Sequence, residues 1–368
     1  MRGYYLRKTA GAFCVLFVIV SLNFFLPRMI FADPAQPYFV GVPEDAVALR
    51  EQIRQAHGFH EPLPVQYLRY LKRVLMLDLG QSHYYKDSVW SVMFSRIPWS
   101  LVLTVSSMVL SVFFGILFGT AAGRRRNGRA DRVLMGLSGI STAIPSFWLA
   151  IVGVMLFGFV WKILPYRGAM TAGYTLTMDG SSFWWVFGAG LLASVTARVL
   201  TRRAVLLCAG IPLALAGALL ASIPMADLAD VAYHAVLPVA ISLCSGIVSY
   251  GLLVRNSMIA VTGADYILTA RAKGLPHRVV LYRHTLRNAL LPLITQVGMS
   301  MAGLLGGSVL MERIFSWPGM GQLLLEACNT GDYQLSQAIL LVYAVITVLC
   351  NFLTDLVYHH FDPRIKEA

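Results

Sequence analysis

The chain has 368 residues, of which 57% are hydrophobic and only 13% are charged. Soluble domains usually carry about 25% charged residues, so this composition excludes an ordinary soluble protein and indicates an integral membrane protein. The formal net charge is +12. In a soluble protein such a charge would suggest nucleic acid as a partner, but in a membrane protein it first reports the orientation of the loops.

Eight apolar runs are long enough to cross a bilayer, which takes roughly 20 residues per helix. The sequence therefore predicts an all-α polytopic membrane protein. The first run follows Arg2, Arg7 and Lys8 and is longer than the core of a cleavable signal peptide, so residues 1–31 are expected to form a retained signal-anchor helix. The expected spans are 10–31, 99–122, 133–161, 183–199, 204–223, 235–255, 288–311 and 336–358.

The distribution of Lys and Arg predicts the orientation. With the N-terminus inside the cell, the inner segments hold 19 Lys and Arg residues, whereas the short outer loops hold 4. The remaining 7 lie in the long segment 32–98, and long translocated segments are exempt from the positive-inside rule. Both termini, including the tail 359–368, are therefore expected in the cytoplasm and 32–98 outside. This topology explains the basic charge without nucleic acid.

The transmembrane domain is expected to cover residues 99–358. Within it, the segment 183–223 is expected to cross twice as a hairpin, because a single crossing would place the basic segment 255–287 outside. The outer segment 32–98 is expected to be helical in part, since EDAVALREQIRQAH and YLRYLKRVLML have apolar residues near helical spacing.

The motifs of several enzyme classes are absent from the sequence. None of the six Lys residues follows a Gly, so there is no phosphate-binding P-loop, and HExxH, GxSxG and CxxC do not occur. The five Cys are scattered, and the paired His57/His60 and His359/His360 lack a third ligand at metal spacing. We therefore expect no catalytic residues, no metal site and no cofactor.

Small residues recur at four-residue spacing at Gly115, Gly119 and Gly123, and again at Gly303 and Gly307. Such spacing lets helices approach closely. Packing within one subunit is the expected role, and contact with a second subunit remains an alternative.

The stretch DYILTARAKGLPHRVVLYRHTLRN, residues 265–288, is basic and interrupts two apolar runs. A short helix from Ala264 to Lys273 is expected to end at Gly274, because Gly adopts the left-handed cap conformation easily. Pro276 suits the first turn of a second helix that leads into the next span. Such a small protruding helix either docks into a groove on a partner or rests on anionic membrane lipid.

Motifs along the chain resemble those of a known family. TARAKG followed by RHTLRNALLP resembles the cytoplasmic coupling loop of permease subunits of binding-protein-dependent ABC importers, in the oligopeptide, dipeptide and nickel branch. The stretches RIPWSLVLT, GRRRNGRAD, IPSFWLAI, MERIFSWPGMGQLL and LCNFLTDLVYHHFDPRI are similar to other stretches of these permeases and occur in the same order. The sequence departs from the family at Leu268, which replaces a leading acidic residue of the broader loop pattern, and in 172–230, which has no recognisable counterpart.

The resemblance implies a type I ABC-importer permease fold in a bacterial or archaeal cytoplasmic membrane, with six core spans plus the extra hairpin 183–223. It implies a transport subunit, not an enzyme, that pairs with a second homologous permease, two ABC ATPase subunits and an extracytoplasmic solute-binding protein. Peptides or a related small solute would be carried. A stand-alone secondary transporter or channel is the alternative, although the spans show few of the midplane charges that it would need.

The resemblance also implies two functional segments. Within the cytoplasmic loop 256–287, residues 264–276 form the coupling helix that docks on the ATPase. The docking residues implied there are Ala270, Arg271, Ala272, Lys273 and Gly274. The outer loop Ser316-Trp317-Pro318-Gly319 would meet the binding protein or gate the cavity, and a rigid turn set by Pro-Gly is the alternative.

Overall fold

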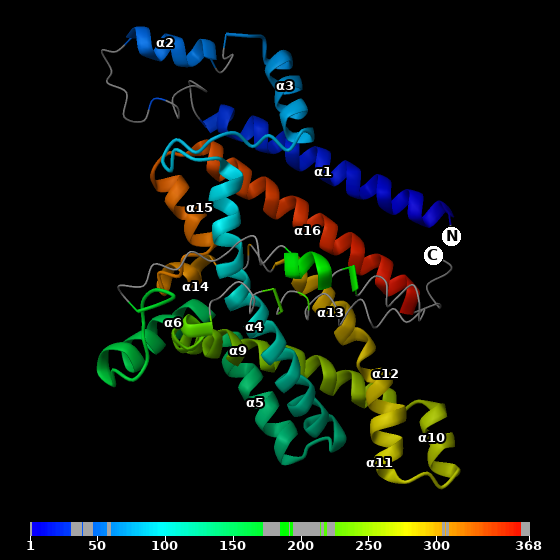
Figure 1. Cartoon of the computed structure of the whole chain (residues 1–368). Helices are drawn as coiled ribbons and strands as arrows, with labels where there is room; N and C mark the ends of the chain where they lie inside the picture. The colour runs from blue at the N-terminus through cyan, green and yellow to red at the C-terminus, as the bar shows by residue number, and fades with distance from the viewer. Residues whose placement is uncertain are drawn as a thin grey trace.

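The computed structural model describes residues 2–30, 39, 47–56, 60–171, 185–190, 192–193, 214, 217–218, 225–303, 306 and 309–361. Every regular element named below is a helix (Figure 1). In chain order they are α1 (Arg2–Ile30), α2 (Val47–Ala56), α3 (Leu63–Leu75), α4 (Val89–Arg124), α5 (Arg129–Ala143), α6 (Ser146–Gly153), η2 (Val154–Val160), α9 (Met225–Thr262), α10 (Asp265–Ala272), α11 (His277–Val279), η3 (Val280–Leu286), α12 (Arg287–Ala289), α13 (Leu291–Ala302), α14 (Val309–Ile314), α15 (Met320–Asn329) and α16 (Tyr333–Phe361).

Four helices in the described part are long and apolar enough to cross a membrane. They cover Arg7–Phe25, Val89–Arg124, Asp227–Thr262 and Tyr333–Phe352. These helices confirm the spans expected at 10–31, 99–122, 235–255 and 336–358. Both α4 and α9 run well beyond a bilayer's thickness, because the polar ends of these helices continue the same backbone hydrogen bonding outside the apolar stretch.

The span expected at 133–161 is instead a broken pair. Helix α5 and the segment formed by α6 and η2 meet at 91°. Pro145 precedes α6, and Ile144 before it has φ −108° and ψ 115°, outside the helical region. A proline disfavours helical geometry in the preceding residue, so the apolar run bends although its composition is continuous.

The three remaining expected spans lie partly or mostly outside the described residues. The expected span 288–311 begins as α12 and α13, and α13 ends at Ala302, with residues 304, 305, 307 and 308 not described. The predicted hairpin 183–223 falls mostly outside the described residues.

The centre of the fold is the packing of α4 on α9. A Cβ atom on Gly119 would lie 2.5 Å from the backbone oxygen of Gly251, and one on Gly115 would lie 2.7 Å from the Cβ of Tyr250. A Cβ on Gly123 would lie 2.9 Å from the Cβ of Met258. The first glycine stripe therefore permits a close helix contact within one subunit, as expected from its spacing.

Helix α1 lies along α16 (Figure 1). The Asn23 side chain donates to the backbone oxygen of Gln337 at 3.0 Å, and the Gln337 side chain donates back to the backbone oxygen of Asn23 at 3.0 Å. Ser21 shares a hydrogen bond of 2.6 Å with Tyr67 of α3. Paired polar groups of this kind hold helices together where lipid offers no alternative partner.

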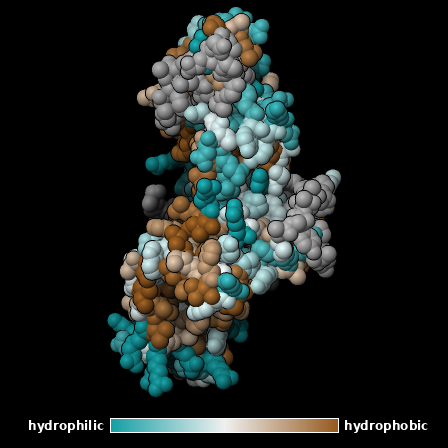
Figure 2. Space-filling view, turned by 90° about the vertical axis from the view of Figure 1, so that its left-hand side faces the viewer, coloured by the Kyte–Doolittle hydropathy of each residue, from teal (hydrophilic) through white to brown (hydrophobic). Residues whose placement is uncertain are grey.

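The surface has a polar end beyond a hydrophobic zone. Figure 2 shows hydrophobic residues concentrated in the lower half of the molecule and hydrophilic residues at its lower tip. Figure 1 places the turn between α4 and α5 and the turn between α10 and α11 at this lower end. These turns carry the basic segments predicted to face the cytoplasm.

Candidate functional sites at the two ends of the helices

Helix α10 ends in a turn whose hydrogen bonds follow the Schellman pattern. Gly274 has φ +71°, and its N–H donates to the backbone oxygen of Arg271 at 2.9 Å. The N–H of Leu275 donates to the backbone oxygen of Ala270 at 3.4 Å. Pro276 then precedes α11. The structure thus confirms a helix that ends at Gly274 and a new helix that starts after Pro276.

One face of α10 packs against the rest of the loop. Ile267 is fully buried, Ala270 is 5% exposed, and both pack with Val280 of η3 and with Val261 at the end of α9. The expectation that Ala270 belongs to the docking surface is therefore corrected. Its small side chain faces inward, where it allows α10 to approach η3 closely.

The other face of α10 is open. Arg271, Ala272, Lys273 and Gly274 are exposed, and Leu268 on the same helix is 55% exposed. A Cβ atom on Gly274 would meet nothing within 4 Å. Four of the five residues implied as docking residues thus form a continuous exposed tip, which we call the α10 tip.

An ion pair between a buried carboxylate and a half-buried guanidinium holds the helix that leads to α10. Asp131 of α5 is 2% exposed and accepts two hydrogen bonds from Arg255 of α9, at 2.8 Å from Nε and at 3.1 Å from the terminal nitrogen. The N–H of Asn127 donates to the same carboxylate at 2.7 Å. Bidentate pairing of this kind is strong and directional. It ties the turn between α4 and α5 to α9, seven residues before α9 ends at Thr262.

The loop 316–319, which is predicted to face outward, is a packed turn. Trp317 is fully buried, its indole N–H donates to the backbone oxygen of Trp99 at 2.8 Å, and the two indole rings meet edge to face. Gly319 is buried as well, since a Cβ atom there would lie 2.4 Å from the carboxyl carbon of Glu312. Ser316, with φ +49°, and Pro318 are half-buried. The geometry favours the rigid turn, with Trp317 as its anchor.

Glu312 organises this turn, and sequence reasoning did not single it out. Its side chain is fully buried and accepts from Ser100 Oγ at 2.7 Å, from the N–H of Gly321 at 2.7 Å and from the N–H of Gln322 at 3.0 Å. Ser100 Oγ in turn accepts from the N–H of Met320 at 2.7 Å. The carboxylate thus caps the N-terminus of α15 and joins α4, α14 and α15.

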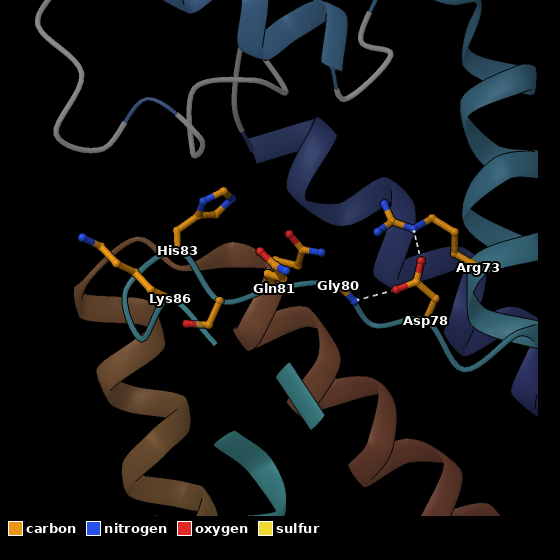
Figure 3. A pocket seen from close by; sticks show the side chains of 8 residues that line it. Arg73, Asp78, Gly80, Gln81, His83 and Lys86 are labelled. Atoms are coloured by element: carbon orange, nitrogen blue, oxygen red, sulfur yellow. Dashed lines mark hydrogen bonds and ion pairs between the residues drawn. The ribbon is translucent and has the colours of Figure 1, made fainter. Parts of the chain in front are cut away.

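A polar cleft of about 650 Å³ opens on the segment between α3 and α4 (Figure 3). Arg73 pairs with Asp78 at 3.0 Å, and Asp78 also accepts from the N–H of Gly80 at 3.1 Å. Lys86 reaches the cleft from the other side (Figure 3). We call this the outer cleft, because it opens on the segment 32–98 that is predicted to lie outside. Its lining consists of Arg73, Asp78, Gly80, Gln81, Ser82, His83, Lys86 and Gln334.

Buried and half-buried hydrogen bonds hold the floor of the outer cleft in place. Ser82, which is 2% exposed, donates to the buried carboxylate of Asp332, which also accepts from the N–H of Tyr84 at 3.2 Å. Tyr85 donates to Glu326 of α15 at 2.7 Å. Burial, followed by this hydrogen bond, raises the pKa of Tyr85 to about 12, so its hydroxyl stays a donor at physiological pH. Sequence reasoning missed the outer cleft because its two sides are about 250 positions apart in the chain.

Among the residues that the structure describes, no group of three or more His, Cys, Asp or Glu could hold a metal ion.

The comparisons with known proteins place the whole chain in one family. Residues 111–367 match the family described as "Binding-protein-dependent transport system inner membrane component", and residues 1–104 match its N-terminal component. The chain is 31% identical over 368 residues to the dipeptide transport system permease protein DppB of Alkalihalophilus pseudofirmus, with 100% of each chain covered.

Two further relatives are also aligned over nearly their whole length. The oligopeptide transport system permease protein AppB of Bacillus subtilis is 29% identical over 368 residues, with 100% of each chain covered. The glutathione transport system permease protein GsiC of Salmonella paratyphi A is 29% identical over 366 residues, covering 100% of this chain and 99% of the relative.

These matches confirm the all-α polytopic fold of a type I importer permease and a transport role that is not enzymatic. Permeases of this kind work with ATPase and solute-binding partners in general. The chain therefore belongs to the inner-membrane permease components of binding-protein-dependent ABC importers, in the oligopeptide and dipeptide branch.

Proposed function

We propose that this chain pairs with a second homologous permease to form the translocation path for peptides or a closely related small solute, and that the α10 tip docks on an ABC ATPase subunit. Two ATPase subunits and an extracytoplasmic solute-binding protein complete the importer. The solute class is inferred from relatives named as permeases for oligopeptides, dipeptides and glutathione. All three solutes are peptides or peptide-like molecules.

The observation that carries the docking proposal is the division of α10 into two faces. Ile267 and Ala270 hold the helix on η3, while Ala272, Lys273 and Gly274 stand free at its tip. A helix that is held on one side and exposed on the other can transmit a displacement without deforming. Such a tip fits a groove on a partner.

The path for such a displacement is short. Helix α9 is continuous from Met225 to Thr262, and α10 begins at Asp265. The ion pair of Arg255 with Asp131 makes α5 follow α9. A movement of α10 would therefore shift α9, and with it α4, which α9 contacts closely along the glycine stripe. This supports alternating access driven from the cytoplasmic side.

At the opposite end, we assign contact with the solute-binding protein to the outer cleft. Trp317 and Gly319 are enclosed by the fold and offer no surface. The outer cleft offers exposed polar side chains of both charges over a hydrogen-bonded base, which suits a transient and polar protein interface.

The docking proposal is tested by a charge reversal at the α10 tip. In the co-expressed importer, Lys273→Glu should reduce recovery of the ATPase subunits with the permease and abolish ATPase stimulation by the binding protein. Arg129→Glu is the matched control, since Arg129 is also exposed on the inner side but lies at the turn between α4 and α5.

Equal recovery of ATPase subunits with both variants would contradict docking at the α10 tip. Solute uptake by the permease alone, with no ATPase present, would instead support the alternative of a stand-alone transporter or channel.

A further inference from the structure

A second cleft, of about 380 Å³, lies on the side of the coupling loop where the chain enters its next apolar helix. It is separate from the α10 tip and from the outer cleft. We call it the basic cleft, and its lining consists of Tyr266, Arg283, His284, Arg287, Asn288 and Leu291.

The charges of the basic cleft are of one sign. Arg283 and Arg287 are four residues apart and both are exposed. The lining includes no Asp or Glu, and neither guanidinium forms an ion pair or hydrogen bond with any residue in the described part of the chain. Two exposed guanidinium groups with their donors available form a site for an anion, and their planar forks suit phosphate oxygens in particular.

A third donor is fixed beside them. The Asn288 side chain donates to the Tyr266 hydroxyl at 3.1 Å and to the backbone oxygen of His284 at 3.0 Å. Because the Tyr266 oxygen accepts from Asn288, the hydroxyl proton is left to donate to a ligand. The first of these bonds joins α12 to α10, so an anion in the basic cleft would contact both sides of the coupling loop.

The position of the basic cleft indicates the kind of anion. Leu291 is the first residue of α13 and is 40% exposed. Tyr266, which also lines the cleft, is 46% exposed. Aromatic rings at the end of an apolar helix are typical of the membrane interface. The lining of the basic cleft thus combines two guanidinium groups with an exposed apolar residue, Leu291, at the start of an apolar helix.

We propose that the basic cleft binds the phosphate of an anionic phospholipid. Arg283 and Arg287 contact the phosphate oxygens, Tyr266 donates to the same group, and the acyl chains lie along α13. Basic pockets on the cytoplasmic side of transmembrane helices bind anionic head groups in this way. A lipid held there braces α10 against α12 from the membrane side and leaves the α10 tip accessible.

Lipid retention by the assembled importer, measured by native mass spectrometry in detergent, tests the proposal. The complex is offered phosphatidylglycerol or phosphatidylcholine at equal concentration. We expect the unmodified importer to retain phosphatidylglycerol. The double variant Arg283→Gln/Arg287→Gln should retain about tenfold less of this lipid. The control Arg129→Gln/Arg278→Gln removes the same charge from exposed positions outside both the basic cleft and the α10 tip, and should lose much less.

Two further variants guard against a misfolded loop. Arg283→Lys/Arg287→Lys keeps the charge and should keep part of the retention, while Tyr266→Phe removes one hydroxyl and should weaken it several-fold. Both should elute as the intact complex on size exclusion.

Four results would overturn the proposal. Equal loss in the cleft and control variants would mean diffuse attraction to the surface, and unchanged retention in the cleft variant would place the lipid elsewhere. Displacement of the lipid by millimolar inorganic phosphate, with phosphate itself bound, would make free phosphate the ligand. Retention by the permease that disappears when the ATPase subunits are present would make an acidic ATPase segment the occupant.

Discussion

The close contact between α4 and α9 gives a quantitative prediction for Gly119→Ala. The added Cβ would lie 2.5 Å from the backbone oxygen of Gly251 and 2.8 Å from the Cβ of Val254. Neither atom is the end of a flexible side chain, so the helices themselves must separate by several tenths of an ångström. Overpacking of a well-packed core costs about 1–3 kcal/mol.

Gly136→Ala on α5 is the matched control, because a Cβ atom there would meet nothing within 4 Å. Replacing Gly in a helix interior by Ala stabilises both variants by about 0.5–1 kcal/mol. The two variants should therefore differ by the overpacking cost alone, about 1–3 kcal/mol. At roughly 2 °C per kcal/mol for a large chain, Gly119→Ala should melt about 2–6 °C below Gly136→Ala. The assay is thermal unfolding of the purified complex, followed by fluorescence-detected size exclusion. Equal melting temperatures would refute the close contact of α4 and α9.

Three further predictions follow from single sites. Asp131→Asn should destabilise the protein by about 3 kcal/mol, because it leaves Arg255 without its charged partner. The double variant Asp131→Asn/Arg255→Gln should lose less stability than the sum of the two single variants. Denaturation midpoints measure these losses, and additive losses would show that the pair is not coupled. Gly274→Asn should keep more solute uptake than Gly274→Val. Position 274 has φ +71° and open space around it, so a substitution there costs backbone strain, which Asn tolerates better than Val. Equal uptake by the two variants would contradict this prediction. The Cys328 thiol is accessible, but partial desolvation raises its pKa. A chain with Cys328 alone should therefore react slowly with an impermeant maleimide added outside at pH 7. Its rate should rise about tenfold per pH unit below the thiol pKa, because only the thiolate reacts; labelling only from the inside would reverse the proposed orientation.

Elements set by local chemistry could be predicted from the sequence. The apolar runs behind α1, α4, α9 and α16 are long enough to identify the spans by themselves. The turn after α10 was also predictable, because Gly274 and Pro276 determine the backbone locally.

Features that depend on distant contacts could not be predicted. Ala270 lies on the inner face because Val280 packs there, and the rotation of a short helix is not fixed by its own sequence. Glu312 caps α15 together with Ser100, which is 212 positions away. The 91° break before Pro145 was missed because the apolar run continues through the proline, and hydropathy does not report the bend.

The central claim, docking of the α10 tip on the ATPase, is tested most directly by crosslinking from two neighbouring positions on α10. In a chain without other cysteines, Ala272→Cys and Ala270→Cys are compared for crosslinking to the co-expressed ATPase subunits with a short bifunctional maleimide. The structure predicts a crosslink from position 272, which is exposed, and none from position 270, which is 5% exposed. No crosslink from position 272 in an intact, correctly inserted complex, or equal crosslinking from both positions, would contradict the account.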